Sequence, residues 1–188
     1  MKNSSVKKDF IMPIVVLSVI CLIVSGALAV TNRFTAPTIA DAARLRADSA
    51  MHELIPDASA FTELDATGLP TNVIEAYAAK ESDDAKHVDG YIFTVSATGY
   101  GGSGSVKIMV AVNTDGRVKA TKTLANGETK GMGSRVSEPD YESQFVGMDD
   151  TLTGYNAVSG ATISSKAYSG AVADALAAYK ILNQGAAQ

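Results

Sequence analysis

The feature that most constrains this chain is an uncharged apolar run at residues 10–30, FIMPIVVLSVICLIVSGALAV. A helix rises 1.5 Å per residue, so about 20 such residues cross the hydrocarbon core of a bilayer. Lys7 and Lys8 stand directly before the run, whereas only Arg33 follows it closely. By the positive-inside rule, this asymmetry predicts a single-pass protein with residues 1–9 in the cytoplasm and everything after the run on the other side of the membrane.

A cleaved signal peptide is the alternative for the same residues. Lysines precede an apolar centre, and Ala27 and Ala29 form a small-residue pattern of the kind found at cleavage sites. The run is longer than the apolar part of most signal peptides, which favours an uncleaved transmembrane anchor at residues 10–31. Both interpretations export the rest of the chain, and they differ only in whether the exported part stays tethered.

The segment 32–58 predicts a helix that connects the anchor to a folded domain. Apolar residues recur at roughly helical spacing from Ile39 to Leu54. Pro37 lies near the expected start of this helix, and Pro56 stops it. Its polar face mixes acidic and basic side chains, which favours packing on a sheet over lying on a membrane surface.

The remaining residues, 59–188, have the pattern of an α+β domain. Runs rich in Val, Ile, Tyr, Phe and Thr predict strands, and the Thr-Asp-Gly turn at 114–116 predicts a hairpin within a mainly antiparallel sheet. A short helix after Ser137 and a final helix at 166–182 are expected, with the helices on one side of the sheet. The expected strands are residues 73–79, 88–98, 106–113 and 117–124, with a charged turn at 83–87.

Composition excludes several classes of function. One cysteine and two histidines leave little for a disulfide framework or for a metal site with nitrogen or sulfur ligands, so no metal is expected. Residues 1–34 have a net charge of +3, which leaves −7 for the remainder of a chain whose total is −4. An acidic domain without a basic, aromatic patch has no electrostatic reason to bind nucleic acid.

Three glycine-bearing segments stand out in the domain: GYGGSGS at 99–105, GETKGMG at 127–133 and SGATISS at 159–165. Taken singly, the first predicts a sharp bend, and Glu128 in the second is read most simply as a solvated loop charge. In the third, Ser or Thr is read most simply as a helix N-cap. A hydroxyl at a helix N-terminus also lies beside free N–H groups and the positive end of the helix dipole, which suits a phosphate.

In this order, behind one N-terminal anchor, these segments resemble the FMN-binding domain family of the RnfG and NqrC subunits. Those subunits belong to the Rnf and Na⁺-translocating NADH:quinone oxidoreductase complexes. The resemblance covers essentially the whole chain, and the compact length is closer to RnfG than to NqrC. The residues that carry it are the anchor, the Thr-Ala-Pro at 35–37, Gly99-Tyr100-Gly101-Gly102, the 128–133 loop and Ser159-Gly160-Ala161-Thr162.

The resemblance implies a covalent flavin on the SGAT segment. In the family, the threonine that ends SGAT is joined by a phosphoester bond to FMN, which a flavin transferase attaches outside the cytoplasm; here this residue is Thr162. Lys130 and Met132 replace the proline and leucine of the family's ETPGLG segment, and Asn156 stands where Asp is common. The residues implied to lie near the flavin are Ser159, Gly160, Ala161, Glu128, Thr129, Gly131, Met132 and Gly133.

The function implied is that of an electron-carrying subunit in the bacterial inner or plasma membrane. Its complex would couple electron transfer between ferredoxin and NAD to Na⁺ or H⁺ translocation, together with multi-span flavin subunits and iron–sulfur subunits. A single membrane helix without an ionisable residue cannot form an ion path, so transport would belong to these partners and no independent catalytic activity is expected. Two alternatives stay open: a stand-alone exported covalent flavoprotein, and an anchored non-redox binding domain in which SGAT only caps a helix.

Overall fold

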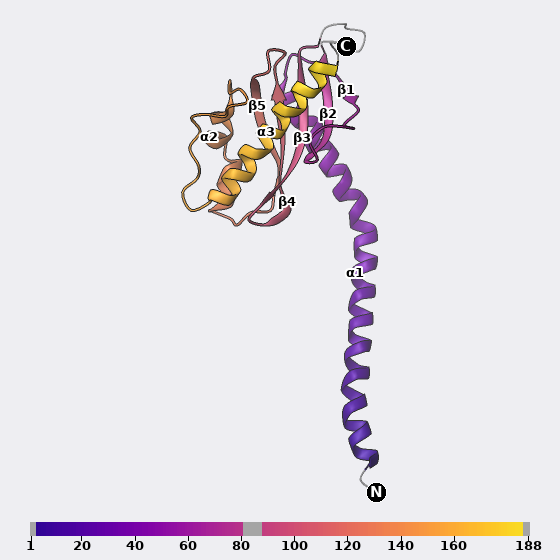
Figure 1. Cartoon of the computed structure of the whole chain (residues 1–188). Coiled ribbons are helices and arrows are strands. Elements are labelled where there is room, and N and C mark those ends of the chain that lie inside the picture. Colours follow the sequence, from indigo (N-terminus) through magenta and orange to yellow (C-terminus); the bar gives the residue numbers. More distant parts are fainter. Residues whose placement is uncertain (1–2, 81–87, 186–188) are drawn as a thin grey trace. The chain divides into compact units, whose positions relative to one another are not determined.

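A computed structural model describes residues 3–80 and 88–185, which divide into two compact units, Met1–Leu45 and Arg46–Gln188 (Figure 1). The charged turn expected at 83–87 falls largely outside the described residues. The helices are α1 (Asn3–Leu54), α2 (Pro139–Glu142) and α3 (Thr162–Gly185), with short 3₁₀ helices η1 (Gly133–Ser137) and η2 (Ser143–Phe145). The strands are β1 (Ala60–Leu64), β2 (Val73–Lys80), β3 (Gly90–Gly99), β4 (Gly102–Val112) and β5 (Val118–Asn126).

The first unit is formed by α1 up to Leu45. Its apolar side chains from Phe10 onward are exposed, and by length and composition it is a candidate membrane span. The structure differs from the expectation of a separate helix starting near Pro37, because α1 is continuous and has this proline inside it. The proline ring fixes φ at a helical value and removes one N–H, which interrupts a single backbone bond without ending the helix.

The second unit is built on a five-stranded antiparallel sheet in the order β1-β2-β3-β4-β5. Each strand pairs with the next one in the chain, as the tight turns predict. The four expected strands are confirmed, with shifts of a few residues at their ends. Strand β1 was not expected, because its five residues, AFTEL, are too few and too mixed to show a period.

The sheet buries both of its faces. Side chains alternate along a strand, so Phe93 and Ile108 face one side while Ile92 and Met109 face the other. On the first side they pack with α3. On the second they pack with the final turns of α1 and the residues after them: Ala50, Met51, Leu54, Ile55 and Ala58.

The expectation of helices on one side of the sheet is therefore wrong. Strands β3 and β4 contain continuous buried runs, such as residues 108–112, in which successive side chains point to opposite faces. A strand that is apolar on both faces needs a cover on each. The end of the segment predicted at 32–58 supplies the second cover, and its helix ends at Leu54, ahead of Pro56 as expected.

We predict that the domain needs residues 46–58 for its stability. A fragment of residues 59–188 lacks Met51, Leu54 and Ile55, each of which contributes about 1.5–3 kcal/mol by burial. It should therefore lose about 5 kcal/mol relative to a fragment of residues 46–188, a large part of a typical domain's stability. Urea unfolding followed by circular dichroism measures the difference.

The matched control is the exposed residue Asp57, whose change to Ala in the longer fragment should alter the free energy of unfolding by less than about 0.5 kcal/mol. Equal stability of the two fragments would show that the contacts made by residues 46–58 do not contribute to the folded domain.

Candidate functional site

The carboxylate of Glu128 joins the three glycine-bearing segments. Its Oε1 accepts hydrogen bonds from the Gly101 N–H (3.0 Å) and the Ser105 hydroxyl (2.6 Å). Its Oε2 accepts hydrogen bonds from the Tyr100 N–H (3.1 Å) and the Ser164 hydroxyl (2.5 Å). One buried side chain thus fixes the β3–β4 turn and the first turn of α3 to the loop that follows β5.

Glu128 is 7% exposed, which corrects its interpretation as a solvated loop charge. Burial raises the pKa of this carboxyl, but the hydrogen bonds from Ser105, Ser164 and the N–H groups of Gly101 and Tyr100 more than offset that effect and hold the pKa below its ordinary value. The group is therefore ionised at neutral pH and is stabilised by four donors rather than by a cation.

Two glycines of these segments are required by the close approach of Glu128. A Cβ added at Gly99 would lie 2.2 Å from Glu128 Oε1. A Cβ added at Gly133 would lie 2.7 Å from Ser164 Oγ and 2.8 Å from Glu128 Cβ. Real Cβ atoms do not approach neighbours this closely, so the absence of a side chain at both positions lets the three segments converge.

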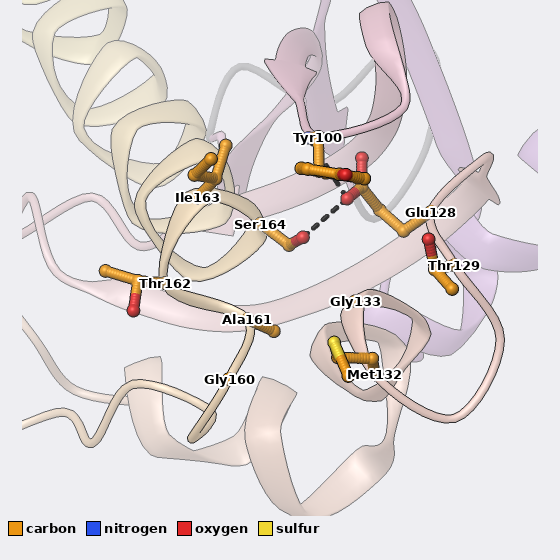
Figure 2. A pocket seen from close by; sticks show the side chains of 10 residues that line it. All are labelled: Tyr100, Glu128, Thr129, Met132, Gly133, Gly160, Ala161, Thr162, Ile163 and Ser164. Carbon is orange, nitrogen blue, oxygen red and sulfur yellow. Dashed lines mark hydrogen bonds between the residues drawn. The ribbon is translucent and has the colours of Figure 1, made fainter.

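A cavity of about 490 Å³ lies where the segments meet (Figure 2). This volume is within the range of about 300–1,000 Å³ that is typical of small-molecule sites. In Figure 2 the Ser164 side chain points to Glu128, and the loop with Thr129, Met132 and Gly133 faces the start of α3. The lining residues are Tyr100, Glu128, Thr129, Met132, Gly133, Gly160, Ala161, Thr162, Ile163 and Ser164.

Seven of the nine residues that the sequence singled out line this cavity. The other two, Gly131 and Ser159, do not. Gly131 is exposed and has a φ of 75°, so it serves the turn of its loop. Ser159 lines a neighbouring, more polar cavity of about 280 Å³ together with Asn156.

Three further lining residues were missed by the sequence reasoning: Tyr100, Ile163 and Ser164. All three lie inside the quoted glycine-bearing segments. The available signal was therefore their position rather than their residue type. Ser164 looks like an ordinary helix-start serine in the sequence, and only the fold brings it to within hydrogen-bond distance of Glu128.

Thr162 is the first residue of α3, which begins four residues earlier than the expected start at Lys166. The helix extends back because the Ser165 hydroxyl accepts the Val158 N–H (2.9 Å) and so holds the turn before it. The Thr162 side chain is exposed and, within the described residues, its hydroxyl makes no hydrogen bond. The residue before the helix, Ala161, has no side-chain oxygen to act as a cap.

An aromatic cluster holds the first turns of α3 in place beside the cavity. Tyr168 is fully buried, and its ring lies 5.4 Å from that of Tyr141 and 5.3 Å from that of Phe145. Its hydroxyl donates to Thr121 Oγ1 on β5 (2.9 Å). Burial raises the pKa of Tyr168, which keeps it neutral. The start of α3 is therefore fixed to β5 independently of Glu128.

Chemically, the arrangement suits a phosphate-bearing ligand with an apolar ring. The N–H groups of the first turn of a helix lack intrahelical partners and lie at the positive end of the helix dipole. Here that turn consists of Thr162, Ile163 and Ser164 at the edge of the cavity. The large side chains of Tyr100 and Ile163 supply apolar surface beside it.

Comparison with known proteins agrees with this description. A family model described as an FMN-binding domain matches residues 99–177, a range that contains all nine residues singled out by the sequence. The RnfG-type subunit of the ion-translocating oxidoreductase complex of Shewanella baltica is 30% identical over 94% of this chain and 90% of its own length. The protein of the same description from Methanosarcina acetivorans is 31% identical over 90% of this chain and 92% of its own length.

A third relative comes from Acetobacterium woodii and is the corresponding RnfG-type subunit of a complex described as a Na⁺-translocating ferredoxin:NAD⁺ oxidoreductase. It is 27% identical over 90% of this chain and 91% of its own length. All three similarities extend well beyond the range of the family model, into the N-terminal helix.

We predict that Glu128→Gln destabilises the domain by about 2–3 kcal/mol at neutral pH. A serine hydroxyl can turn to accept a hydrogen bond, but the N–H groups of Tyr100 and Gly101 cannot, and each faces a different oxygen. Either orientation of the glutamine amide therefore sets an NH₂ group against a backbone N–H. Urea unfolding of both proteins measures the loss.

The same pair of proteins should differ less in acid. Because the folded-state pKa of Glu128 is lowered, its contribution is present above the ordinary pKa and is lost as pH falls through the folded value. Glu63→Gln, on the exposed side of β1, serves as the control and should change neither quantity. A gap in stability that stays constant from neutral to strongly acidic pH would contradict the assigned role.

We also predict opposite effects for two glycine-to-alanine changes. Gly133→Ala should destabilise the domain by about 1–3 kcal/mol, because its Cβ would overlap Ser164 and Glu128. Gly170→Ala, on the exposed side of α3 with open space around it, should stabilise by about 0.5–1 kcal/mol through helix propensity. The free energies of unfolding of the two variants decide this, and a stable Gly133→Ala protein would mean that the three segments are not held tightly together.

Proposed function

The chain belongs to the RnfG family of ion-translocating oxidoreductase subunits, and from this membership we propose that it is an electron-transfer subunit with FMN in phosphoester linkage to Thr162. Its complex would couple electron transfer between ferredoxin and NAD to the translocation of Na⁺ or H⁺. The name of the Acetobacterium woodii relative supports this coupling.

The observation that carries the proposed linkage is the setting of the Thr162 hydroxyl. It is exposed, it has no hydrogen-bond partner within the described residues, and it stands on the first residue of α3 at the edge of the cavity. A hydroxyl used as a helix cap would be occupied by a backbone N–H. This one is accessible to a modifying enzyme, and the adjoining N–H groups would accept the resulting phosphodiester.

The other cavity residues would bind and orient the flavin. Gly160 and Ala161 leave room for the ribityl chain next to the linkage, since neither has a bulky side chain. Thr129 and Met132 line the opposite side from their loop, and Glu128 holds that loop against α3. FMN, when bound, supplies the redox chemistry, and the protein supplies its position and surroundings.

We propose that α1 anchors the subunit with its N-terminus in the cytoplasm and the domain outside. The apolar run from Phe10 and the basic pair Lys7 and Lys8 support this orientation. A covalent bond has a clear advantage there, because an exported protein cannot draw replacement FMN from the cytoplasm. Maturation would require a flavin transferase on the same side, and the flavin and iron–sulfur subunits of the complex would exchange electrons with the attached flavin.

Mass spectrometry of the full chain, produced together with a flavin transferase, tests the linkage. The wild-type protein should carry one FMN on the peptide that contains Thr162, Thr162→Ala should carry none, and Thr162→Ser should keep it at a lower yield. Thr129→Ala is the matched control, because Thr129 presents another threonine hydroxyl to the same cavity. An adduct that survives Thr162→Ala and disappears in Thr129→Ala would move the linkage to the other loop.

Purification in mild detergent separates the proposed subunit from a stand-alone exported flavoprotein. The subunit should co-purify with multi-span membrane proteins, whereas an independent carrier would elute alone with its flavin. A wild-type protein without flavin, from cells that contain an active transferase, would favour a non-redox domain.

A further inference from the structure

The mouth of the cavity is bordered by exposed apolar side chains. Tyr100 is 71% exposed, Ile163 is 55% exposed and Met132 is 52% exposed. In the described part of residues 46–188, these are three of the six large apolar residues that are exposed, and all three line this cavity. Such a grouping around a concave site marks a surface that is covered in the working molecule.

Tyr100 is the most exposed of the three, yet its backbone is held firmly. The N–H groups of Tyr100 and Gly101 both bind the Glu128 carboxylate. The adjoining Gly99 packs so closely on Glu128 that no side chain fits there. The turn therefore presents a bare aromatic ring from a fixed base, and no hydrogen bond within the described residues engages its hydroxyl.

The position of this ring relative to α3 is set by the same carboxylate. Glu128 Oε2 accepts hydrogen bonds from both the Tyr100 N–H and the Ser164 hydroxyl. Figure 2 shows Tyr100 and the start of α3 joined through this one group. The tyrosine and the proposed attachment residue, Thr162, thus border the same cavity on elements that share a common tie.

We propose that Tyr100 positions the flavin by packing its ring on the face of the isoalloxazine, with Met132 and Ile163 bordering the ring system. The inference rests on the proposed attachment of FMN in this cavity. Aromatic rings gain about 0.5–1.5 kcal/mol from offset stacking beyond the burial of their area, and the flavin ring system is planar and largely apolar on its faces. Stacking would bury the exposed tyrosine and remove water from one face of the flavin.

The experiment uses the full chain with FMN attached and compares Tyr100→Leu, Tyr100→Phe and Tyr100→Trp with the wild type. Tyrosine and tryptophan rings in contact with an excited flavin quench its emission, whereas phenylalanine and leucine do not. The emission per attached flavin should rise several-fold in the Leu and Phe variants and stay low in the Trp variant. The midpoint potential should shift in the Leu variant and return toward the wild-type value in the Phe variant, which keeps an aromatic face.

Ile181→Ala removes an exposed apolar side chain at the other end of α3 and should leave both readings unchanged. Urea unfolding of each variant confirms that the domain stays folded. A Tyr100→Leu protein that carries FMN but matches the wild type in emission and potential would overturn the inference, and the apolar mouth would then be assigned to contact with another subunit.

A second measurement separates this inference from the linkage itself. Free FMN is titrated into full-length Thr162→Ala protein, with and without Tyr100→Leu, and flavin emission is recorded. Quenching that depends on Tyr100 supports the positioning role even if the wild type proves to have no covalent adduct at Thr162. Emission that is independent of Tyr100 in both measurements overturns the positioning role and leaves the linkage to be judged by mass spectrometry.

Discussion

The site depends on a single buried carboxylate that has no cationic partner. A desolvated charge is costly unless hydrogen bonds replace its water, and Glu128 receives four of them from residues that are distant in the sequence. The donors come from the turn after β3, from β4 and from α3, so the charge can be satisfied only when all these elements are in place. The electrostatic requirement of one side chain therefore specifies the relative positions of the segments that enclose the cavity.

Much of the fold could be predicted from local patterns. The central strands are long enough to show their composition, and the Thr-Asp-Gly turn fixes the pairing of β4 with β5. The Phe10–Val30 run is readable from length and charge alone. The glycine-bearing segments were recognised by their order, and seven of the nine residues proposed there line one cavity.

What the sequence did not predict depends on contacts between distant residues. Glu128 looks like any loop glutamate until Ser105 and Ser164 are brought to it by the fold. The second cover of the sheet was missed because the final turns of α1 follow a long apolar helix, and their burial follows from packing rather than from their own period. The start of α3 was placed too late, since the serines that favour a cap in isolation form its first turn and bond outward instead.

The place of α3 as the last element of the chain has a consequence for biogenesis. A chain is made from its N-terminus, so all five strands exist before this helix is complete. Until then, the face of the sheet that contains Phe93 and Ile108 has no partner, and Glu128 lacks the Ser164 donor. Completion of the core and assembly of the cofactor pocket are thus one event at the end of synthesis, and any flavin-loading enzyme that recognises the assembled pocket receives only chains whose last helix has already docked.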